Sequence, residues 1–166
     1  MSARLAPRVD DPASRGFFEL AAEGTLGVLT CTDCGARVHL PRPRCVGCGG
    51  NNLEWSAVAG RGRAKSWTVV EHQVHPLFPV PYTVVLIDVA GEQNVRMIGH
   101  LPGRVDVDET TEFVVEFEDL GPDREGNARV LPKWTIAKER VGDNRRSDLV
   151  QVARTKASSR HVSTAT

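Results

Sequence analysis

The sequence predicts a mostly β protein in which a short helix and a small cysteine-rich module precede a five-stranded barrel. Three observations lead to this expectation. All 4 cysteines lie in one Gly- and Pro-rich segment that lacks apolar periodicity. The chain after that segment alternates apolar and polar residues with the period of a strand. No long helical pattern separates the expected strands.

The first expected element is a short amphipathic helix near the N-terminus. Asp11-Pro12 places an N-cap residue before a proline at the first helical position, and Gly24 provides a stop. Phe17 and Phe18 lie on the apolar stripe of this helix. Such a pair usually packs into the protein's own core, but a short helix ahead of a separate module can also meet another chain. Phe17 and Phe18 are therefore candidate partner-binding residues.

The cysteine-rich module contains two C-x-x-C pairs, each followed by glycine. Four thiolates form the tetrahedral ligand set that structural zinc prefers. Glycine after the second cysteine allows a turn that brings backbone N–H groups toward the sulfurs. We predict one structural Zn²⁺ ion per chain with no coordination position left for water. Its ligands are Cys31, Cys34, Cys45 and Cys48.

Two other uses of four cysteines compete with zinc. Disulfides are rare in reducing compartments, and the N-terminus shows no secretory signal. Iron, in a cluster or a rubredoxin-like site, also takes four thiolates, and ligand count alone does not distinguish it from zinc. The longest apolar run, Val84 to Ile87, is too short to span a bilayer, so we expect a soluble cytoplasmic protein.

The barrel is expected after Gly60-Arg61-Gly62, where the sequence changes to alternation rich in β-branched and aromatic residues. In the clearest strand, Phe113, Val115 and Phe117 share one face and glutamates the other, as in a sheet with one wet side. Short strands without intervening helices indicate a small closed or nearly closed barrel. The expected strands are Ser66 to Glu71, Tyr82 to Val89, Val95 to Gly99, Thr111 to Phe117 and Val130 to Ile136.

The end of the chain, from Asn144 to Thr166, is rich in Arg, Ser and Thr without periodicity. We predict a mobile tail there. The expected organisation is an N-terminal helical segment at 1–28, a zinc ribbon at 29–56, the barrel at 57–140 and the tail at 141–166.

Charge limits the kinds of partner. The 21 basic and 21 acidic residues give a formal net charge of zero, which argues against nonspecific nucleic-acid coating and a polybasic membrane anchor. Local basic clusters are usually solvated faces, although arginine also binds phosphates well. One cluster lies in the ribbon and a second where the ribbon meets the barrel. They consist of Arg37, Arg42 and Arg44, and of Arg61, Arg63 and Lys65.

The sequence shows no recognisable catalytic constellation. Gly60-Arg61-Gly62 precedes a strand and lacks the other residues of a phosphate-binding loop. His72, His75 and His100 lie on or beside expected strands without a nucleophile motif. We therefore predict that the chain is not an enzyme on its own.

The order of these features resembles the DUF35 family, acyl-CoA-associated proteins with a rubredoxin-like zinc ribbon and an OB-fold. The resemblance extends from about Asp10 to Ala137. It rests on the Asp-Pro helix with Phe17-Phe18, Pro41-Arg42-Pro43, Leu53-Glu54-Trp55, Gly60-Arg61-Gly62, Thr68-Val69-Val70 and Pro81-Tyr82.

The resemblance implies that the five-stranded barrel is an OB-fold and that the chain works with a thiolase-superfamily subunit. Such a partner performs thiolytic, condensing or retro-aldol reactions on acyl-CoA thioesters, including steroid side-chain and lipid degradation. The chain would help to bind or position the shared acyl-CoA and stabilise the partner, which would hold the catalytic residues. Basic side chains suit the phosphates of acyl-CoA, and aromatic rings suit its adenine or acyl portion. The candidate acyl-CoA contacts are Arg61, Arg63, Lys65, Trp67, Phe78 and Tyr82.

An alternative function is single-stranded nucleic-acid binding, because zinc ribbons and OB-folds both occur in such proteins. The zero net charge and the aromatic content of 5% argue against it, since a groove for nucleic acid needs excess cations and stacking rings.

Overall fold

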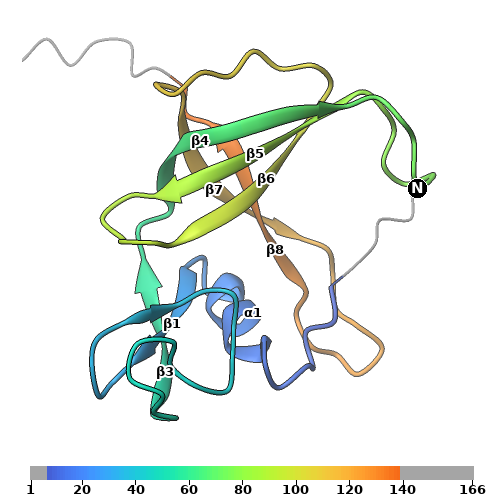
Figure 1. The fold of residues 1–166 in the computed structure, drawn as a ribbon. Helices are drawn as coiled ribbons and strands as arrows, with labels where there is room; N and C mark the ends of the chain where they lie inside the picture. The colour runs from blue at the N-terminus through green and yellow to red at the C-terminus, as the bar shows by residue number, and fades with distance from the viewer. Residues whose placement is uncertain (1–6, 139–166) are drawn as a thin grey trace, which may run out of the picture.

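The structure is a computed structural model, and it describes residues 7–138. Two antiparallel sheets and one short helix make up the fold, which confirms the predicted mostly β class (Figure 1). The smaller sheet has the strand order β2-β1-β3 and the larger one β6-β5-β4-β7-β8. The elements are α1 (Arg15–Ala22), β1 (Leu26–Cys31), β2 (Arg37–Val38), β3 (Leu53–Val58), β4 (Arg61–Val70), β5 (Tyr82–Val89), β6 (Arg96–Pro102), β7 (Glu112–Asp119) and β8 (Val130–Ile136).

Helix α1 begins later than the sequence predicted. The carbonyl of Asp11 accepts hydrogen bonds from the backbone N–H groups of Ser14 and Arg15, at 3.0 and 2.8 Å, so Asp11 starts a turn that leads into the helix. Ser14, not Asp11, occupies the N-cap position. The predicted stop is confirmed, because Gly24 has a φ of 72° just after the helix ends, a conformation that glycine adopts at little cost.

The five-stranded sheet curls into a nearly closed barrel. Strand β4 pairs with both β5 and β7, and β7 pairs with β8. The two edge strands approach each other at Gly99 on β6, where an added Cβ would lie 3.2 Å from the Cβ of Trp134 on β8. This order of strands is that of an OB-fold.

One strand boundary differs clearly from the sequence prediction. Strand β4 begins at Arg61 instead of Ser66, because residues 61–63 pair with β7 and the pairing with β5 begins at Gly62. A β-bulge between Ala64 and Ser66 interrupts the alternation of buried and exposed residues. The search for alternating apolar and polar residues therefore missed the first half of this strand.

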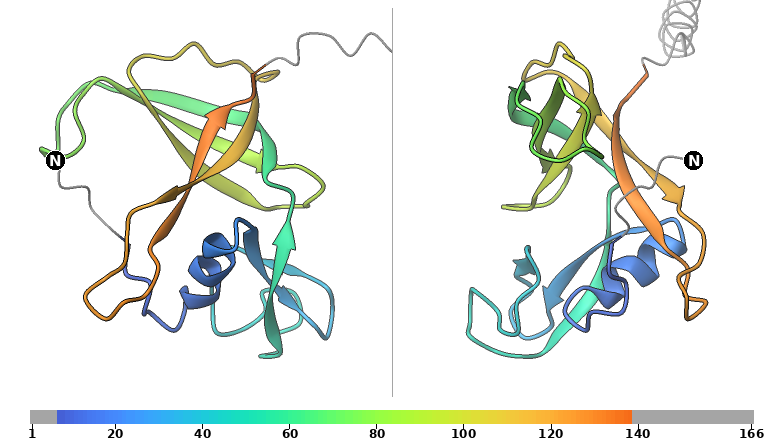
Figure 2. Two further views of the ribbon diagram at one scale, coloured as in Figure 1. Left: turned by 180° about the vertical axis from the view of Figure 1, so that it is seen from behind. Right: turned by 90° about the vertical axis from the view of Figure 1, so that its right-hand side faces the viewer.

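The main core fills the barrel and continues into the elements below it. Ile87, Phe113 and Trp134 are buried inside the barrel, and Leu26 and Val28 of β1 belong to the same cluster. Helix α1 lies beside the lower end of β8 (Figure 2). The helix and β1 therefore close one end of the barrel.

The predicted division into segments remains a prediction. Strand β1 extends across the expected boundary at residue 28, and β3 extends across the one at residue 56. The two strands pair along their whole length, from Leu26 opposite Val58 to Cys31 opposite Leu53. The predicted tail at 141–166 lies outside the described residues.

A partly buried ion pair connects the ribbon to the barrel. Arg37 on β2 forms two hydrogen bonds with the Glu92 carboxylate in the β5–β6 turn, with N···O distances of 2.7 and 3.0 Å. The same guanidinium donates to the hydroxyls of Thr30 and Ser56, on the two neighbouring ribbon strands. The side chains of Arg37 and Glu92 are only 27% and 13% exposed, so solvent screens this pair poorly.

We expect Arg37→Ala to lower the free energy of unfolding by about 2–4 kcal/mol, because it leaves the Glu92 carboxylate partly buried without its cation. Urea denaturation followed by circular dichroism measures the change. Arg63→Ala is the matched control: its ion pair with Glu112 is 67% and 58% exposed, and its loss should cost less than about 1 kcal/mol. Equal losses in the two variants would contradict a special role for Arg37.

Candidate functional site

The four cysteine sulfurs form a compact group in the ribbon. All of them lie within 4.8 Å of one another, with 3.6 Å between Cys31 and Cys48 and 3.5 Å between Cys34 and Cys45. A disulfide requires about 2.05 Å. Four thiolates around one zinc ion, at Zn–S distances of about 2.3 Å, lie about 3.8 Å apart. The spacing therefore fits a single tetrahedral metal ion and not two disulfides.

The two cysteine knuckles have the local backbone that thiolate ligands need. Gly35 and Gly49 adopt φ values of 74° and 77°, the turn that the sequence predicted after each C-x-x-C pair. The backbone N–H groups of Cys48 and Gly47 lower the pKa of Cys45 to about 6. Since the thiolate is the metal-binding form, these N–H groups favour ligation by Cys45.

The metal-binding group and the small core of the ribbon share residues. Cys31 and Cys45 are buried together with Leu29 and Val38, whereas Cys34 and Cys48 are exposed. The side chain of Asn52 donates to Asp33, between the first two cysteines, at 2.8 Å. The ribbon therefore presents one side of the metal site to its core and the other to solvent.

The predicted acyl-CoA contacts do not form one surface. Arg61 and Arg63 line an open hollow of about 1550 Å³ along β4, β7 and β8. The Arg63 guanidinium lies 2.6 Å from the Glu112 carboxylate, and Asp88, Asp108 and Glu116 line the same hollow. The cations in this hollow therefore face a comparable number of carboxylates.

The β-bulge separates Trp67 from the other aromatic candidates. Trp67 lies opposite the fully buried Val85, so the two share the inner face of the sheet, although the indole is partly exposed. Tyr82, in contrast, lies on the outer face together with the β4–β5 loop residue Phe78. Lys65 is the exposed residue at the bulge itself.

A cluster of rings occupies one end of the outer face of β5 and β6. Ring centroids are 4.9 Å apart for Tyr82 and His100, 5.9 Å for Phe78 and His100, and 6.0 Å for His75 and Phe78. The sequence marked the two histidines only as weak catalytic candidates. Phe78 contacts both of them, and the place of His100 in the cluster depends on the register that sets Val84 opposite His100, which the sequence does not reveal.

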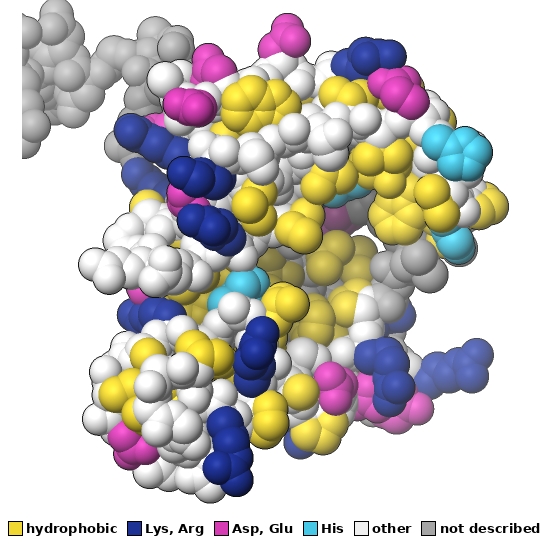
Figure 3. Space-filling view, viewed as in Figure 1, with side chains coloured by type: hydrophobic (Ala, Val, Ile, Leu, Met, Phe, Trp, Pro, Cys, Tyr) yellow, Lys and Arg dark blue, Asp and Glu magenta, His cyan; other side chains and the backbone are white. Residues whose placement is uncertain are grey.

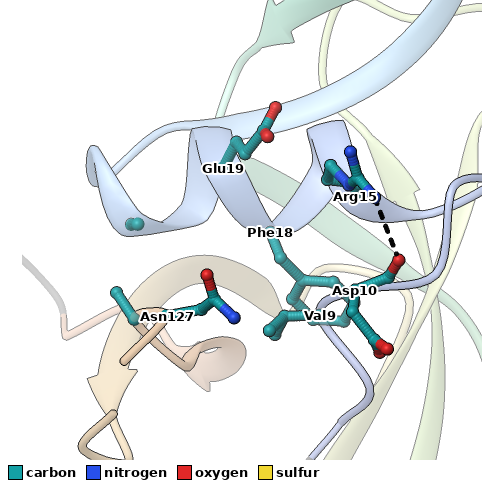
Figure 4. Close-up of a pocket in the computed structure, with 8 residues that line it drawn as sticks. Val9, Asp10, Arg15, Phe18, Glu19 and Asn127 are labelled. Carbon is teal, nitrogen blue, oxygen red and sulfur yellow. Dashed lines mark hydrogen bonds between the residues drawn. The ribbon is translucent and has the colours of Figure 1, made fainter. Parts of the chain in front are cut away.

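The two phenylalanines of α1 have different surroundings. Phe17 packs against the barrel core, with its ring 6.2 Å from Trp55 and 5.3 Å from Phe18. Phe18 instead lines a hollow of about 490 Å³ between α1 and the β7–β8 loop, opposite Asn127 (Figure 4). At the rim, Arg15 donates to the carbonyl of Asp10 at 3.3 Å.

Within residues 7–138, no helix has the length and apolar character needed to cross a membrane.

Comparison with known proteins supports the ribbon assignment. Residues 18–54 match the family described as ChsH2, rubredoxin-like zinc ribbon domain. This stretch contains all four cysteines. A protein from Thermomonospora curvata named probable enoyl-CoA hydratase alpha subunit is 34% identical over 89 residues. That match covers 52% of this chain, which spans only 27% of the relative's length.

One solved structure extends the likeness to the barrel. A chain of the Ltp2-ChsH2(DUF35) aldolase superposes with a TM-score of 0.65 at 25% identity, over 80% of this chain and 100% of that one. A DUF35 protein of unknown function from Sulfolobus solfataricus is more distant, with a TM-score of 0.47 and 15% identity over 63% of this chain and 77% of that one. Residues 18–54 are therefore similar to the ChsH2 zinc ribbon, and the predicted resemblance of the chain to the DUF35 family is confirmed.

Proposed function

We propose that this chain is a non-catalytic accessory subunit of a complex that acts on acyl-CoA thioesters, with a thiolase-superfamily protein as its catalytic partner. The observation that carries the proposal is the likeness over the whole length of a chain from the Ltp2-ChsH2(DUF35) aldolase. The relative named as a hydratase subunit supports acyl-CoA chemistry in the same way. Retro-aldol, thiolytic and condensing reactions in lipid or steroid side-chain degradation are the candidate chemistries of the partner.

The described residues support an accessory role. Four cysteines fill the coordination sphere of a tetrahedral ion and leave no position at which a metal would activate water. Nδ1 of His75 accepts a hydrogen bond from the backbone N–H of Leu77, at 3.2 Å. This nitrogen is therefore engaged in a hydrogen bond within the β4–β5 loop. The partner contacts proposed for α1 are Phe18, which faces the hollow, and Phe17, which also supports the core.

We expect the purified full-length chain to show no thiolase, aldolase, hydratase or thioesterase turnover, because the catalytic groups would lie on the partner. Co-expression with the thiolase-superfamily protein encoded in the same host should yield a stable complex with acyl-CoA activity. Size-exclusion chromatography and a coupled CoA-release assay measure the two properties. Robust turnover by the chain alone would contradict the accessory role, as would the absence of any complex.

For the metal, we propose one structural zinc ion held by the four cysteines. When bound, zinc supplies folding free energy to a module whose own core is small. The donor set fits this role, because Cys31 and Cys45 are also members of that core. Loss of the ion would therefore weaken the packing around Leu29 and Val38 as well.

Elemental analysis should find one zinc per chain. Cys34→Ser and Cys48→Ser should abolish stoichiometric zinc and increase hydrogen exchange in β2 and at the Cys31 end of β1, while the amides of β5 and β7 remain protected because they belong to the separate barrel core. Val46→Ala is the control, since this side chain in the second knuckle is exposed and should leave metal content unchanged. An iron absorption spectrum, or an equally protected ribbon in metal-free protein, would contradict the proposal.

The proposed acyl-CoA contacts require a phosphate to meet the basic residues of β4. Arg61 has no ion pair with another residue between 7 and 138, whereas Arg63 would have to exchange Glu112 for a phosphate. Phe78 and Tyr82 offer rings to the adenine or acyl portion on a different part of the barrel. The proposal therefore assigns the charged and apolar ends of the ligand to separate groups of residues.

The double variant Arg61→Glu and Arg63→Glu should raise the KM of the complex for its CoA substrate about fivefold or more, since charge reversal repels the phosphates. The effect should shrink with added salt, because exposed charges are screened. Steady-state kinetics at matched protein concentration test it, with Arg124→Glu in the β7–β8 loop as an exposed control. An unchanged KM would mean that the two arginines form only a solvated face.

A further inference from the structure

The outer face of β4, β5 and β6 carries an apolar strip that no other strand or helix of the described chain covers. Ile98 at its centre is 72% exposed. Strand β5 packs between β4 and β6, and β6 also contacts β8. Among the described loops, the β4–β5 loop reaches this face, at one end (Figures 1 and 2). Register sets Ser66, Leu86 and Ile98 in one row, and Thr68, Val84 and His100 in the next. We call Val84, Leu86 and Ile98 the apolar face.

The ring cluster continues the apolar face along the strands. Tyr82 follows Val84 on the outer side of β5, and its ring contacts those of Phe78 and His100. Figure 3 shows hydrophobic side chains and histidines gathered over this upper part of the molecule. The apolar face and the cluster therefore form one continuous surface, which is more extensive than the scattered exposed side chains of an ordinary surface.

Two ion pairs border this surface, and Lys65 at the bulge is an exposed cation beside it for which the described residues show no ion pair. Arg96 lies 2.8 Å from Asp88, next to Leu86 and Ile98 along the strands. At the opposite end, Arg104 lies 2.8 Å from Glu71. A phosphate-rich ligand binds through cations that are free to pair with it, whereas an apolar centre with a neutral polar rim is the anatomy of a protein–protein interface.

We propose that the apolar face docks the catalytic subunit of the complex through an uncharged, apolar surface of that subunit. The inference rests on the proposed function, and it adds the site of contact. Charge complementarity selects this occupant: both rim arginines are already matched by carboxylates, which leaves Lys65 as a single cation for an acidic partner or a nucleic acid, and the exposed Ile98 suits an apolar pocket. An acyl group held by Phe78 and Tyr82 would then lie at the boundary between the subunits.

Ile98→Glu and Ile98→Arg test the proposal. The catalytic subunit is purified from the wild-type complex, and its binding to each full-length variant is measured by isothermal titration calorimetry. Both substitutions should weaken binding about tenfold or more, because either charge would be desolvated at the centre of an apolar contact. The thermal midpoint of each variant should match the wild type, since Ile98 is already in water. Val46→Glu, 65% exposed on the ribbon, should bind as the wild type does.

The outcomes separate the two proposals. If the wild-type complex forms and both Ile98 variants bind with unchanged affinity, the docking inference is wrong while the accessory function stands. If the wild type forms no complex, both fall together. A wild-type homodimer that Ile98→Glu dissociates without affecting the catalytic subunit would assign the face to a second copy and overturn the inference. Oligonucleotide binding that Ile98→Arg strengthens and Ile98→Glu weakens would overturn it in favour of nucleic acid.

Discussion

The placement of the ribbon on the barrel depends on the guanidinium of Arg37. It bridges Thr30 and Ser56 on the ribbon sheet and the Glu92 carboxylate of the β5–β6 turn. Between residues 7 and 138, backbone pairing does not join the two sheets, so this side-chain network supplies the directional contact between them. Apolar packing of α1 and β1 against the barrel is less directional. A charge that is satisfied only in one arrangement therefore gives this interface its orientation.

That orientation connects the metal site to the rest of the fold. Cys31 ends the strand β1 whose first residues, Leu26 and Val28, belong to the barrel core. One strand thus enters the large hydrophobic core at one end and the four-thiol group at the other. Because β1 extends from the barrel core to Cys31, the orientation of the ribbon also determines where the cysteines lie relative to the barrel.

The sequence was sufficient where one local pattern determined the structure. Two C-x-x-C pairs predicted the sulfur group, and alternation predicted the strands β5, β7 and β8. It failed where the determinant lies far along the chain. Arg37 resembled any ribbon arginine, because its partner Glu92 lies 55 residues further along the chain. The candidate acyl-CoA contacts on β4 are also divided by the bulge at Lys65, which places Trp67 on the inner face opposite Val85.

The filled interior of the barrel limits where a ligand can bind. Phe113, Ile87 and Trp134 fill the interior, so a ligand of any size must bind outside. On the outside, carboxylates sit opposite several arginines, as Glu112 does for Arg63 and Asp88 for Arg96. On the outer face of β5 and β6, an arginine paired in this way has less attraction for a phosphate chain, and the face keeps its apolar strand residues. We therefore expect recognition at the apolar face to depend on shape and apolar contact, which favours a protein surface over a nucleic acid.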